Sequence, residues 1–254
     1  MKKLLLGVLA MSIMLVFTNC SGTKTLNKAL ANPENVTKLK ISYGQLNNLP
    51  KEIGKLTNLK TLYLFKNGLR SIPEEIGDLK NLETLVISSN NLVEIPASIG
   101  QLTKLKKLSL KHNKIKRLPA EIGNLTELKE LYVEYNDLET LPASIGNLKN
   151  IVFLNINNNK LNKLPVEIGN LESLKFFVIG KNSLTDLPEE IGNLSSLREL
   201  NVAFCGPMVR IPESIEFCKS LEFLYIDKTL LLPYTINNVN PRLQVVVKER
   251  GELN

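Results

Sequence analysis

Hydrophobic residues recur in this chain with a period of 23 residues. Positions 59, 62, 64 and 69 are all leucine, and the alternation over Leu62–Leu64 has the two-residue period of a β-strand. Seven prolines lie 23 residues apart, from Pro50 to Pro188, and Pro212 follows after 24 because of one extra residue near 206–209. A fixed period of this size predicts a solenoid, in which one supersecondary unit stacks on the next.

Each repeat is expected to contain a strand, a turn and a return segment. Side chains between the inward leucines point out of the coil, and Asn67 with its equivalents places a buried amide at the turn, where it can bond backbone groups of neighbouring coils. Proline opens the return segment, which suits a short helix or 3-10 turn. A repeated glycine, first Gly54, then breaks this segment, and we interpret it as a left-handed helix end.

The segment LPKEIGKLTNLKTLYLFKNGL at 49–69 resembles the leucine-rich repeat family in its 23-residue bacterial form, and the likeness covers about residues 35–231. The resemblance implies an α/β solenoid, a right-handed arc with a parallel β-sheet on the concave face and short helical or 3-10 segments on the convex face. About nine repeats are expected over 36–232. They must stack on one another, because one coil cannot bury its leucines alone. We expect an N-terminal cap over 26–35 and a C-terminal cap over 233–254, with an irregular stretch at 230–240 and a final strand at 243–247.

Residues 1–19 are expected to be a signal peptide. Lys2 and Lys3 precede an apolar run over 4–17, which is shorter than the ~20 residues of a membrane-spanning helix. Cys20 follows and resembles the lipidated cysteine of bacterial lipoproteins, although Phe17 and Asn19 depart from that family's usual residues. The resemblance implies a lipid anchor at Cys20, a tether over 20–25 and a cell-envelope location at the outer membrane or cell surface. Ordinary signal cleavage and an uncleaved anchor are the alternatives.

Composition and motifs argue against catalysis and nucleic-acid binding. The formal charge is +7, but 32 basic residues are interleaved with 25 acidic ones and form no basic stripe. His112 has no partner for a catalytic triad or a metal shell, and the glycines occur singly, unlike a phosphate-binding loop. No enzyme, cofactor or metal site is therefore expected. Cys205 and Cys218 are expected to be buried thiols, with a disulfide as the lesser alternative.

The outward positions of the strands carry the residues that the repeat does not dictate. The chain has 8 Phe and 6 Tyr residues, and ten of them are expected there. Exposed rings on a sheet are typical of interfaces, so we predict a surface that binds a protein or peptide partner. The candidate residues are Tyr63, Phe65, Tyr132, Tyr135, Phe153, Phe176, Val178, Phe204, Phe223 and Tyr225.

Three other interpretations of these rings stay open. They could bind a glycan by stacking on sugar rings, they could belong to a structural spacer without a ligand, or they could simply pack across the sheet. Charges between the aromatic groups are expected to form lateral ion pairs, Lys107 with Glu130 and Lys111 with Glu134.

Overall fold

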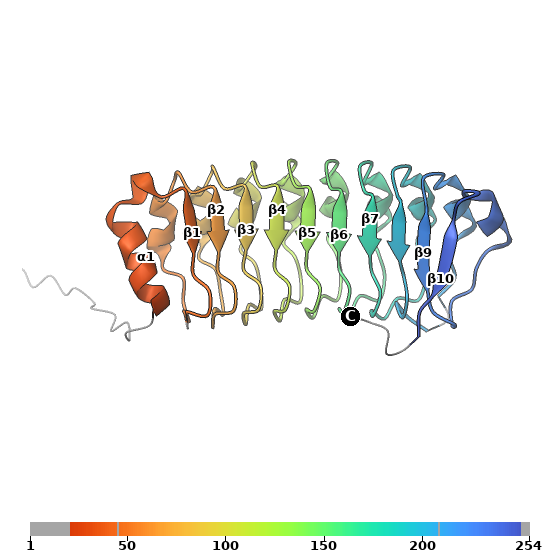
Figure 1. The fold of residues 1–254 in the computed structure, drawn as a ribbon, viewed down its shortest axis with the longest axis horizontal. Coiled ribbons are helices and arrows are strands. Elements are labelled where there is room, and N and C mark those ends of the chain that lie inside the picture. Colours follow the sequence, from red (N-terminus) through yellow and green to blue (C-terminus); the bar gives the residue numbers. More distant parts are fainter. Residues whose placement is uncertain (1–20, 45, 208, 250–254) are drawn as a thin grey trace, which may run out of the picture.

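The structure is a computed structural model that describes residues 21–44, 46–207 and 209–249. Its described residues form one sheet of ten parallel strands, in which each strand pairs with the next along the chain (Figure 1). The predicted solenoid is confirmed. The strands are β1 Lys38–Lys40, β2 Thr61–Tyr63, β3 Thr84–Val86, β4 Lys107–Ser109, β5 Glu130–Tyr132, β6 Phe153–Asn155, β7 Phe176–Val178, β8 Glu199–Asn201, β9 Phe223–Ile226 and β10 Gln244–Val247.

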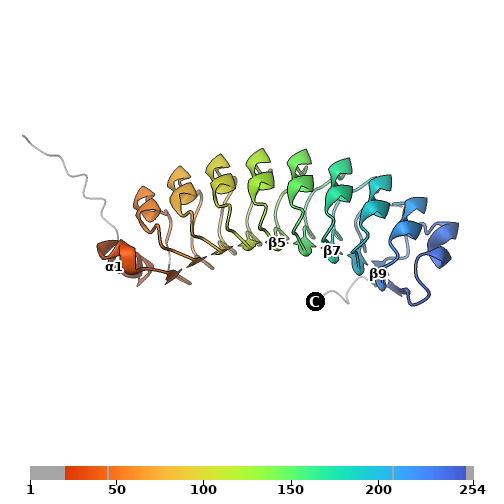
Figure 2. The same cartoon turned by 90° about the horizontal axis from the view of Figure 1, so that it is seen from above.

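The return segments are 3-10 helices that line the outer curve of the arc, while the strands line its inner curve (Figure 2). A proline stands directly before each of η2 to η10 in extended conformation, as at Pro119, because its fixed φ and missing N–H suit the entry to a helix. The 3-10 helices are η1 Pro33–Asn35, η2 Lys51–Lys55, η3 Glu74–Asp78, η4 Ala97–Gln101, η5 Ala120–Asn124, η6 Ala143–Asn147, η7 Val166–Asn170, η8 Glu189–Asn193, η9 Glu213–Phe217 and η10 Tyr234–Asn238.

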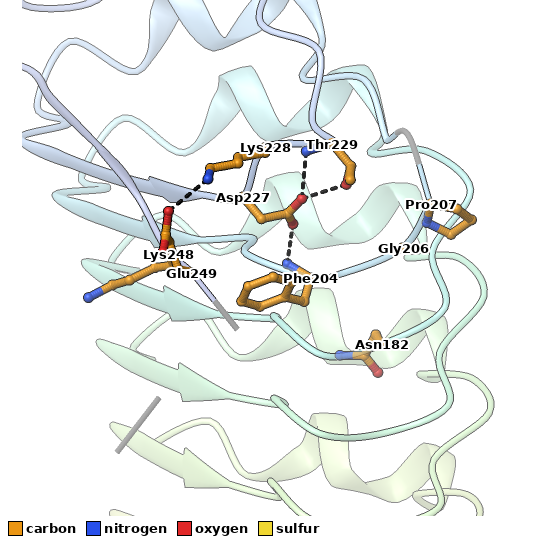
Figure 3. Close-up of a pocket in the computed structure, with 9 residues that line it drawn as sticks. All are labelled: Asn182, Phe204, Gly206, Pro207, Asp227, Lys228, Thr229, Lys248 and Glu249. Carbon is orange, nitrogen blue, oxygen red and sulfur yellow. Dashed lines mark hydrogen bonds and ion pairs between the residues drawn. The ribbon is translucent and has the colours of Figure 1, made fainter. Parts of the chain in front are cut away.

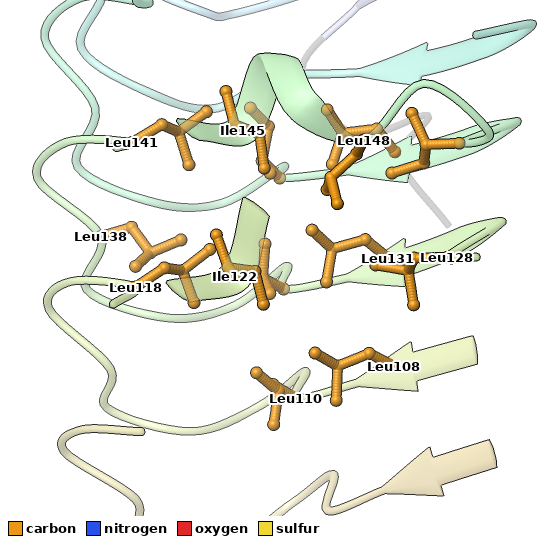
Figure 4. Packing of buried hydrophobic residues seen from close by; sticks show 14 of the residues in the cluster. Leu108, Leu110, Leu118, Ile122, Leu128, Leu131, Leu138, Leu141, Ile145 and Leu148 are labelled. Atoms are coloured by element: carbon orange, nitrogen blue, oxygen red, sulfur yellow. The ribbon is translucent and has the colours of Figure 1, made fainter. Parts of the chain in front are cut away.

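The core is a continuous stack of aliphatic side chains between the strands and the 3-10 helices (Figure 4). Each coil adds equivalent residues, so that Leu108, Leu131 and Leu154 are fully buried next to one another. Figure 4 shows how Ile122 and Ile145 from successive 3-10 helices close the core on the convex side. Each coil therefore buries its leucines against two neighbours, as a solenoid requires.

The buried asparagine at each turn joins adjacent coils. Asn136 donates from Nδ2 to the backbone oxygen of Leu110 at 3.1 Å and to that of Val133 at 3.0 Å. Its Oδ1 accepts the backbone N–H of Ile115 at 3.0 Å. The same bonds recur at Asn90, Asn113, Asn159 and Asn182, and Asn67 makes equivalent ones. The predicted role of this amide is confirmed, because it satisfies backbone groups that the turn would otherwise leave without partners.

The repeated glycine has a different role from the one predicted. It lies inside each 3-10 helix instead of ending it, and none of these glycines has a left-handed φ. A Cβ at Gly123 would lie 2.4 Å from the backbone oxygen of Ser144 in the next coil, and one at Gly169 would lie 2.4 Å from that of Glu190. Glycine is thus needed for close packing of successive coils, and the left-handed helix end is a wrong prediction.

A left-handed backbone conformation occurs instead at the residue that precedes each turn asparagine or its equivalent. We call the series formed by these asparagines and their equivalents the ladder. We call the set of residues that precede the ladder positions the turn row, and its members have φ between 50° and 60°: Tyr43, Lys66, Ser89, His112, Tyr135, Asn158, Lys181 and Phe204. Such a φ is uncommon for residues other than glycine. It persists here because the backbone bonds of neighbouring coils fix the turn, as where His112 N–H donates to the oxygen of Glu134 at 3.0 Å.

The two ends of the solenoid differ from the prediction in detail. The N-terminal helix α1 spans Ser21–Ala31, so the residues expected as a tether after Cys20 are helical from Ser21. Leu26 and Ala29 of α1 are buried against the first coil, as expected of a cap. The predicted signal peptide and Cys20 lie outside the described residues.

At the C-terminal end the stretch at 230–240, expected to be irregular, contains the further 3-10 helix η10. β10 forms the predicted final strand and pairs with β9. It covers β9 but leaves its own inward residues, Val245 and Val247, 39% and 47% exposed. The inward side of β10 is therefore only partly covered by the described residues.

Replacement of Asn136 by alanine should destabilise the fold strongly. The Ile115 N–H and the carbonyls of Leu110 and Val133 would lose buried hydrogen bonds, and one unsatisfied buried group costs about 1–3 kcal/mol. We expect a loss of at least about 2 kcal/mol in urea unfolding. The matched control is Asn124→Ala on the exposed end of η5, which should change stability by less than about 0.5 kcal/mol. Equal effects of the two substitutions would contradict this role of the ladder.

Candidate functional site

Two rows of side chains cover the concave face of the sheet. One row, which we call the first row, consists of the first residue of every strand. The other, which we call the third row, consists of the third residue, because alternate residues of a strand point to the same face. The first row runs Lys38, Thr61, Thr84, Lys107, Glu130, Phe153, Phe176, Glu199, Phe223 and Gln244. The third row runs Lys40, Tyr63, Val86, Ser109, Tyr132, Asn155, Val178, Asn201, Tyr225 and Val246.

Three rings form a continuous aromatic strip across the middle of this face. Tyr132 of β5 lies 4.9 Å from Phe153 of β6, and Phe153 lies 6.1 Å from Phe176 of β7, measured between ring centroids. Both contacts are tilted, which is a favourable geometry for aromatic pairs. All three side chains stay partly exposed. The strip therefore packs along the sheet and also offers ring surface to solvent.

Of the ten candidate residues, eight lie on the strands or directly after one, and two do not. Tyr63, Tyr132, Phe153, Phe176, Val178, Phe223 and Tyr225 belong to the first and third rows, and Phe65 follows β2. Tyr135 and Phe204 belong to the turn row, at the rim of the sheet, so their predicted placement on strands is wrong. None of the ten is fully buried. Their role in binding stays a prediction.

The candidate aromatic residues do not form one continuous patch, because β8 divides them. Glu199 and Asn201 of β8 separate the strip from a second ring pair, Phe223 and Tyr225 of β9, whose centroids are 6.3 Å apart. In the N-terminal part, Phe65 contacts Tyr43 edge-to-face at 5.6 Å. Tyr135 stacks on His112 at 4.3 Å and 10°. The rings thus form separate small groups along the arc.

Charge on the face is concentrated next to the strip. Lys107 Nζ lies 2.6 Å from Glu130 Oε2 and 4.8 Å from the centre of the Tyr132 ring, and the Tyr132 hydroxyl donates to the same carboxylate oxygen at 3.0 Å. The Lys107 hydrogen bond lowers the pKa of Glu130, with a smaller contribution from Tyr132. The predicted lateral pair is confirmed, and it holds the Tyr132 ring in place.

A second acid on this face, Glu134, is mostly buried. Its side chain is 8% exposed, and its Oε1 lies 3.8 Å from Lys111 Nζ, which confirms the second lateral pair. Its Oε2 has no hydrogen-bond partner among the described residues. Burial raises the pKa of Glu134, and its own backbone N–H and Lys111 offset this only in part. Glu134 is therefore held in the coil at an energetic cost.

A hollow of about 640 Å³ opens beside the C-terminal part of the sheet (Figure 3). It lies where Cys205 replaces the ladder asparagine and the repeat gains its extra residue. There the Leu184 N–H, which a ladder asparagine would bind through its Oδ1, donates to the backbone oxygen of Cys205 at 2.7 Å. The carboxylate of Asp227 accepts the backbone N–H groups of Phe204 and Thr229. The hollow is lined by Asn182, Phe204, Gly206, Pro207, Asp227, Lys228, Thr229, Lys248 and Glu249.

The sequence prediction missed Glu199 and this hollow. Aligning the repeats would have marked Glu199, since its neighbours in the first row are both phenylalanine. The hollow has no such signal, because it depends on how the backbone accommodates one extra residue.

The described chain holds two buried cysteines and no cluster of metal ligands. Cys205 and Cys218 are buried free thiols, as predicted, and burial raises the pKa of each to about 12. A thiol with such a pKa is a poor nucleophile at neutral pH. Within the described ranges, no three His, Cys, Asp or Glu side chains gather as a metal site. The same ranges hold no helix with the length and apolar character to cross a membrane.

Comparison with known proteins agrees with the fold. A family described as a leucine-rich repeat region matches residues 35–111 and 98–179, more than half of the chain. A leucine-rich repeat protein of Leptospira interrogans is 30% identical, with a TM-score of 0.61, over 88% of this chain and 75% of that one. No curated protein matches the sequence.

Two further solved structures are similar. The leucine-rich repeat domain of the type III effector XopL is 25% identical, with a TM-score of 0.75, over 89% of this chain and 80% of that one. The plant peptide hormone receptor RGFR1, solved in complex with RGF2, is 29% identical, with a TM-score of 0.61, over 84% of this chain. Our chain spans 40% of that receptor chain.

Glu130 and Glu134 should affect stability with opposite signs. The pKa of Glu130 is lowered in the fold, so its contribution is present above the unfolded pKa and is lost as pH falls through the folded one. The pKa of Glu134 is raised, so its contribution is present below the unfolded pKa and is lost as pH rises through the folded one. At pH 7, Glu130→Gln should lower Tm by about 1–3 °C, whereas Glu134→Gln should leave it unchanged or raise it.

Thermal unfolding of both variants and the parent protein at pH 7 and pH 4 checks this. The Tm difference between Glu130→Gln and the parent should shrink at pH 4. A lower Tm for Glu134→Gln than for Glu130→Gln at pH 7 would contradict the assignment.

Proposed function

This chain belongs to the leucine-rich repeat family, and we propose that it is a non-catalytic cell-envelope lipoprotein that binds a protein or peptide partner through its concave face. The family and its fold are generally non-enzymatic binding scaffolds and often serve protein–protein interaction. The RGFR1 structure is one in which such a solenoid carries a peptide hormone. These likenesses support the proposal for a binding role.

The observation that carries the proposal is the aromatic strip of Tyr132, Phe153 and Phe176. Rings on three adjacent strands remain partly exposed on a face that no described element covers. Aromatic residues dominate the energetics of protein interfaces because they bury a large area at a small cost in conformational entropy. Their mutual packing accounts for the ring edges that touch, and the remaining exposed surface is available to a partner.

The charged side chains beside the strip are paired with each other. Lys107 and Glu130 neutralise each other, and the Tyr132 hydroxyl is engaged by the same carboxylate. A partner would therefore meet pre-oriented rings bordered by a neutral ion pair. Pre-orientation lowers the entropy lost on binding.

The anchoring part of the proposal rests on Cys20. Because α1 begins at Ser21, acyl chains on Cys20 would be joined directly to the N-terminal end of the solenoid. Two or more acyl chains on one residue give stable membrane attachment. The proposed location is the outer membrane or cell surface.

Substitution of Phe153, Phe176 and Tyr225 together by serine should abolish partner capture. These residues come from three strands of the concave face and contribute rings from both groups. In a pull-down from envelope and host extracts with the mature chain, we expect at least a tenfold loss of the specifically captured protein, which corresponds to about 1.4 kcal/mol. Quantitative mass spectrometry measures the loss.

The matched control removes aromatic rings elsewhere. Phe217 and Tyr234 are 62% and 99% exposed on the 3-10 helices, and Phe217→Ser with Tyr234→Ser should leave capture unchanged. Circular dichroism must show that both variants fold. Equal capture by the triple variant and the parent would refute concave-face binding and leave the spacer. Binding to a polysaccharide array without protein capture would favour glycan recognition.

Replacement of Cys20 by alanine should remove the lipid. In cells grown with an alkyne-labelled fatty acid, the parent protein should carry the label and sediment with membranes, because its acyl chains insert in the bilayer. The Cys20→Ala protein should carry no label. Equal labelling of the variant, or no labelling of the parent, would contradict the proposed anchor.

A further inference from the structure

Glu199 lies between two phenylalanine rings on the concave face. In the first row, Glu199 of β8 pairs laterally with Phe176 of β7 on one side and with Phe223 of β9 on the other. Parallel strands are about 4.8 Å apart, so all three side chains rise from adjacent positions. Tyr225 in the third row of β9 contacts Phe223 and also carries an electrostatic interaction with Glu199. A half-buried carboxylate is thus bordered by aromatic rings.

Other described acids on or beside the concave face have direct partners. Glu130 has Lys107, Glu134 has Lys111, and Asp227 accepts backbone N–H groups. Glu199 has no hydrogen bond or ion pair among the described residues, because its lateral neighbours cannot supply either one. Such a group is costly to the fold, and burial raises its pKa.

Lys248 supplies the nearest compensating charge. It follows β10, and its charge offsets part of the effect of burial on the Glu199 pKa. Its ammonium lies 5.0 Å from the centre of the Tyr225 ring. A cation of the chain itself therefore already rests against one ring of this group without forming an ion pair with Glu199.

We propose that Glu199, Phe176, Phe223 and Tyr225 form a subsite for one cationic side chain, lysine or arginine, of the partner. This inference rests on the proposed function, since it names the chemistry of one residue of the ligand. The carboxylate supplies a charge-assisted hydrogen bond, and the ring faces attract a cation through their quadrupoles. An anionic side chain would be repelled by the Glu199 carboxylate, and a neutral one would leave that half-buried carboxylate without an ion-pair partner.

Lys248 acts in this arrangement as an internal competitor. It shares the Tyr225 ring with an incoming cation and contributes the positive charge that the ligand would replace. Removal of this lysine should therefore strengthen binding of a cation at Glu199, whereas removal of Glu199 should abolish it.

Small probes test the subsite without the natural partner. The folded chain, labelled with fluorine on its phenylalanines, is titrated with N-acetyl-arginine methylamide and N-acetyl-lysine methylamide. The citrulline analogue, neutral and of nearly the same shape as arginine, is the matched probe. We expect saturable shifts of the Phe176 and Phe223 signals with the cationic probes and at least tenfold weaker binding of citrulline.

Two variants and one control complete the experiment. Glu199→Gln should weaken the cationic probes at least tenfold, and Lys248→Gln should strengthen them several-fold. Glu121→Gln, which removes an exposed acid on the convex 3-10 helix η5, should leave them unchanged. Absence of saturable binding, equal binding of citrulline, or unchanged binding by the Glu199→Gln protein would overturn the subsite.

The outcome is distinguishable from failure of the proposed function. If the triple serine variant loses its partner while these probes fail, the concave face binds and only the cationic subsite is wrong. If the triple variant keeps its partner, concave-face binding itself fails, whatever the probes do.

Discussion

The buried amide of the ladder asparagine is the interaction on which the rest of the structure depends. Each one binds backbone groups of its own coil and of the preceding coils, as Asn113 does when it donates to the carbonyls of Ile87 and Leu110. The leucines alone would allow coils to slide, because hydrophobic contacts are not directional. The amides fix the register, and the fixed turn holds one residue per coil in a left-handed conformation. The ladder thereby decides which side chains reach the rim and which stay on the sheet.

The C-terminal part of the arc shows what happens when this constraint is relaxed. Cys205 has no amide, and the Leu184 N–H donates to its backbone oxygen instead. The Phe204 N–H donates to the carboxylate of Asp227 in the following coil, whereas equivalent N–H groups of the turn row donate to a backbone oxygen. The extra residue near Gly206 is accommodated at the same place, and the hollow forms beside it. The fold thus changes its bonding, its repeat length and its surface together, which distinguishes this end from the uniform coils before it.

The sequence predicts well whatever the 23-residue period determines directly. Inward leucines, the ladder and the Lys107–Glu130 pair follow once equivalent positions are known. Backbone angles and approach distances do not follow. The sequence predicts a helix end at Gly123 because glycine often has that role, but only the packed coils reveal the Ser144 carbonyl that excludes a Cβ. The sequence wrongly predicts strand positions for Tyr135 and Phe204, because alternation does not show where a strand ends and the chain turns.

On the concave face, residues that stabilise the fold differ from residues whose presence only binding explains. The rings of Phe153 and Phe176 pack on each other, so sheet stability alone could retain them. Glu199 has no such explanation, because a half-buried carboxylate without a direct partner among the described residues opposes folding. Residues that break a local rule without structural compensation are expected at functional sites. The acid between the rings is therefore stronger evidence for a ligand than the rings themselves, and it indicates a positive charge on that ligand.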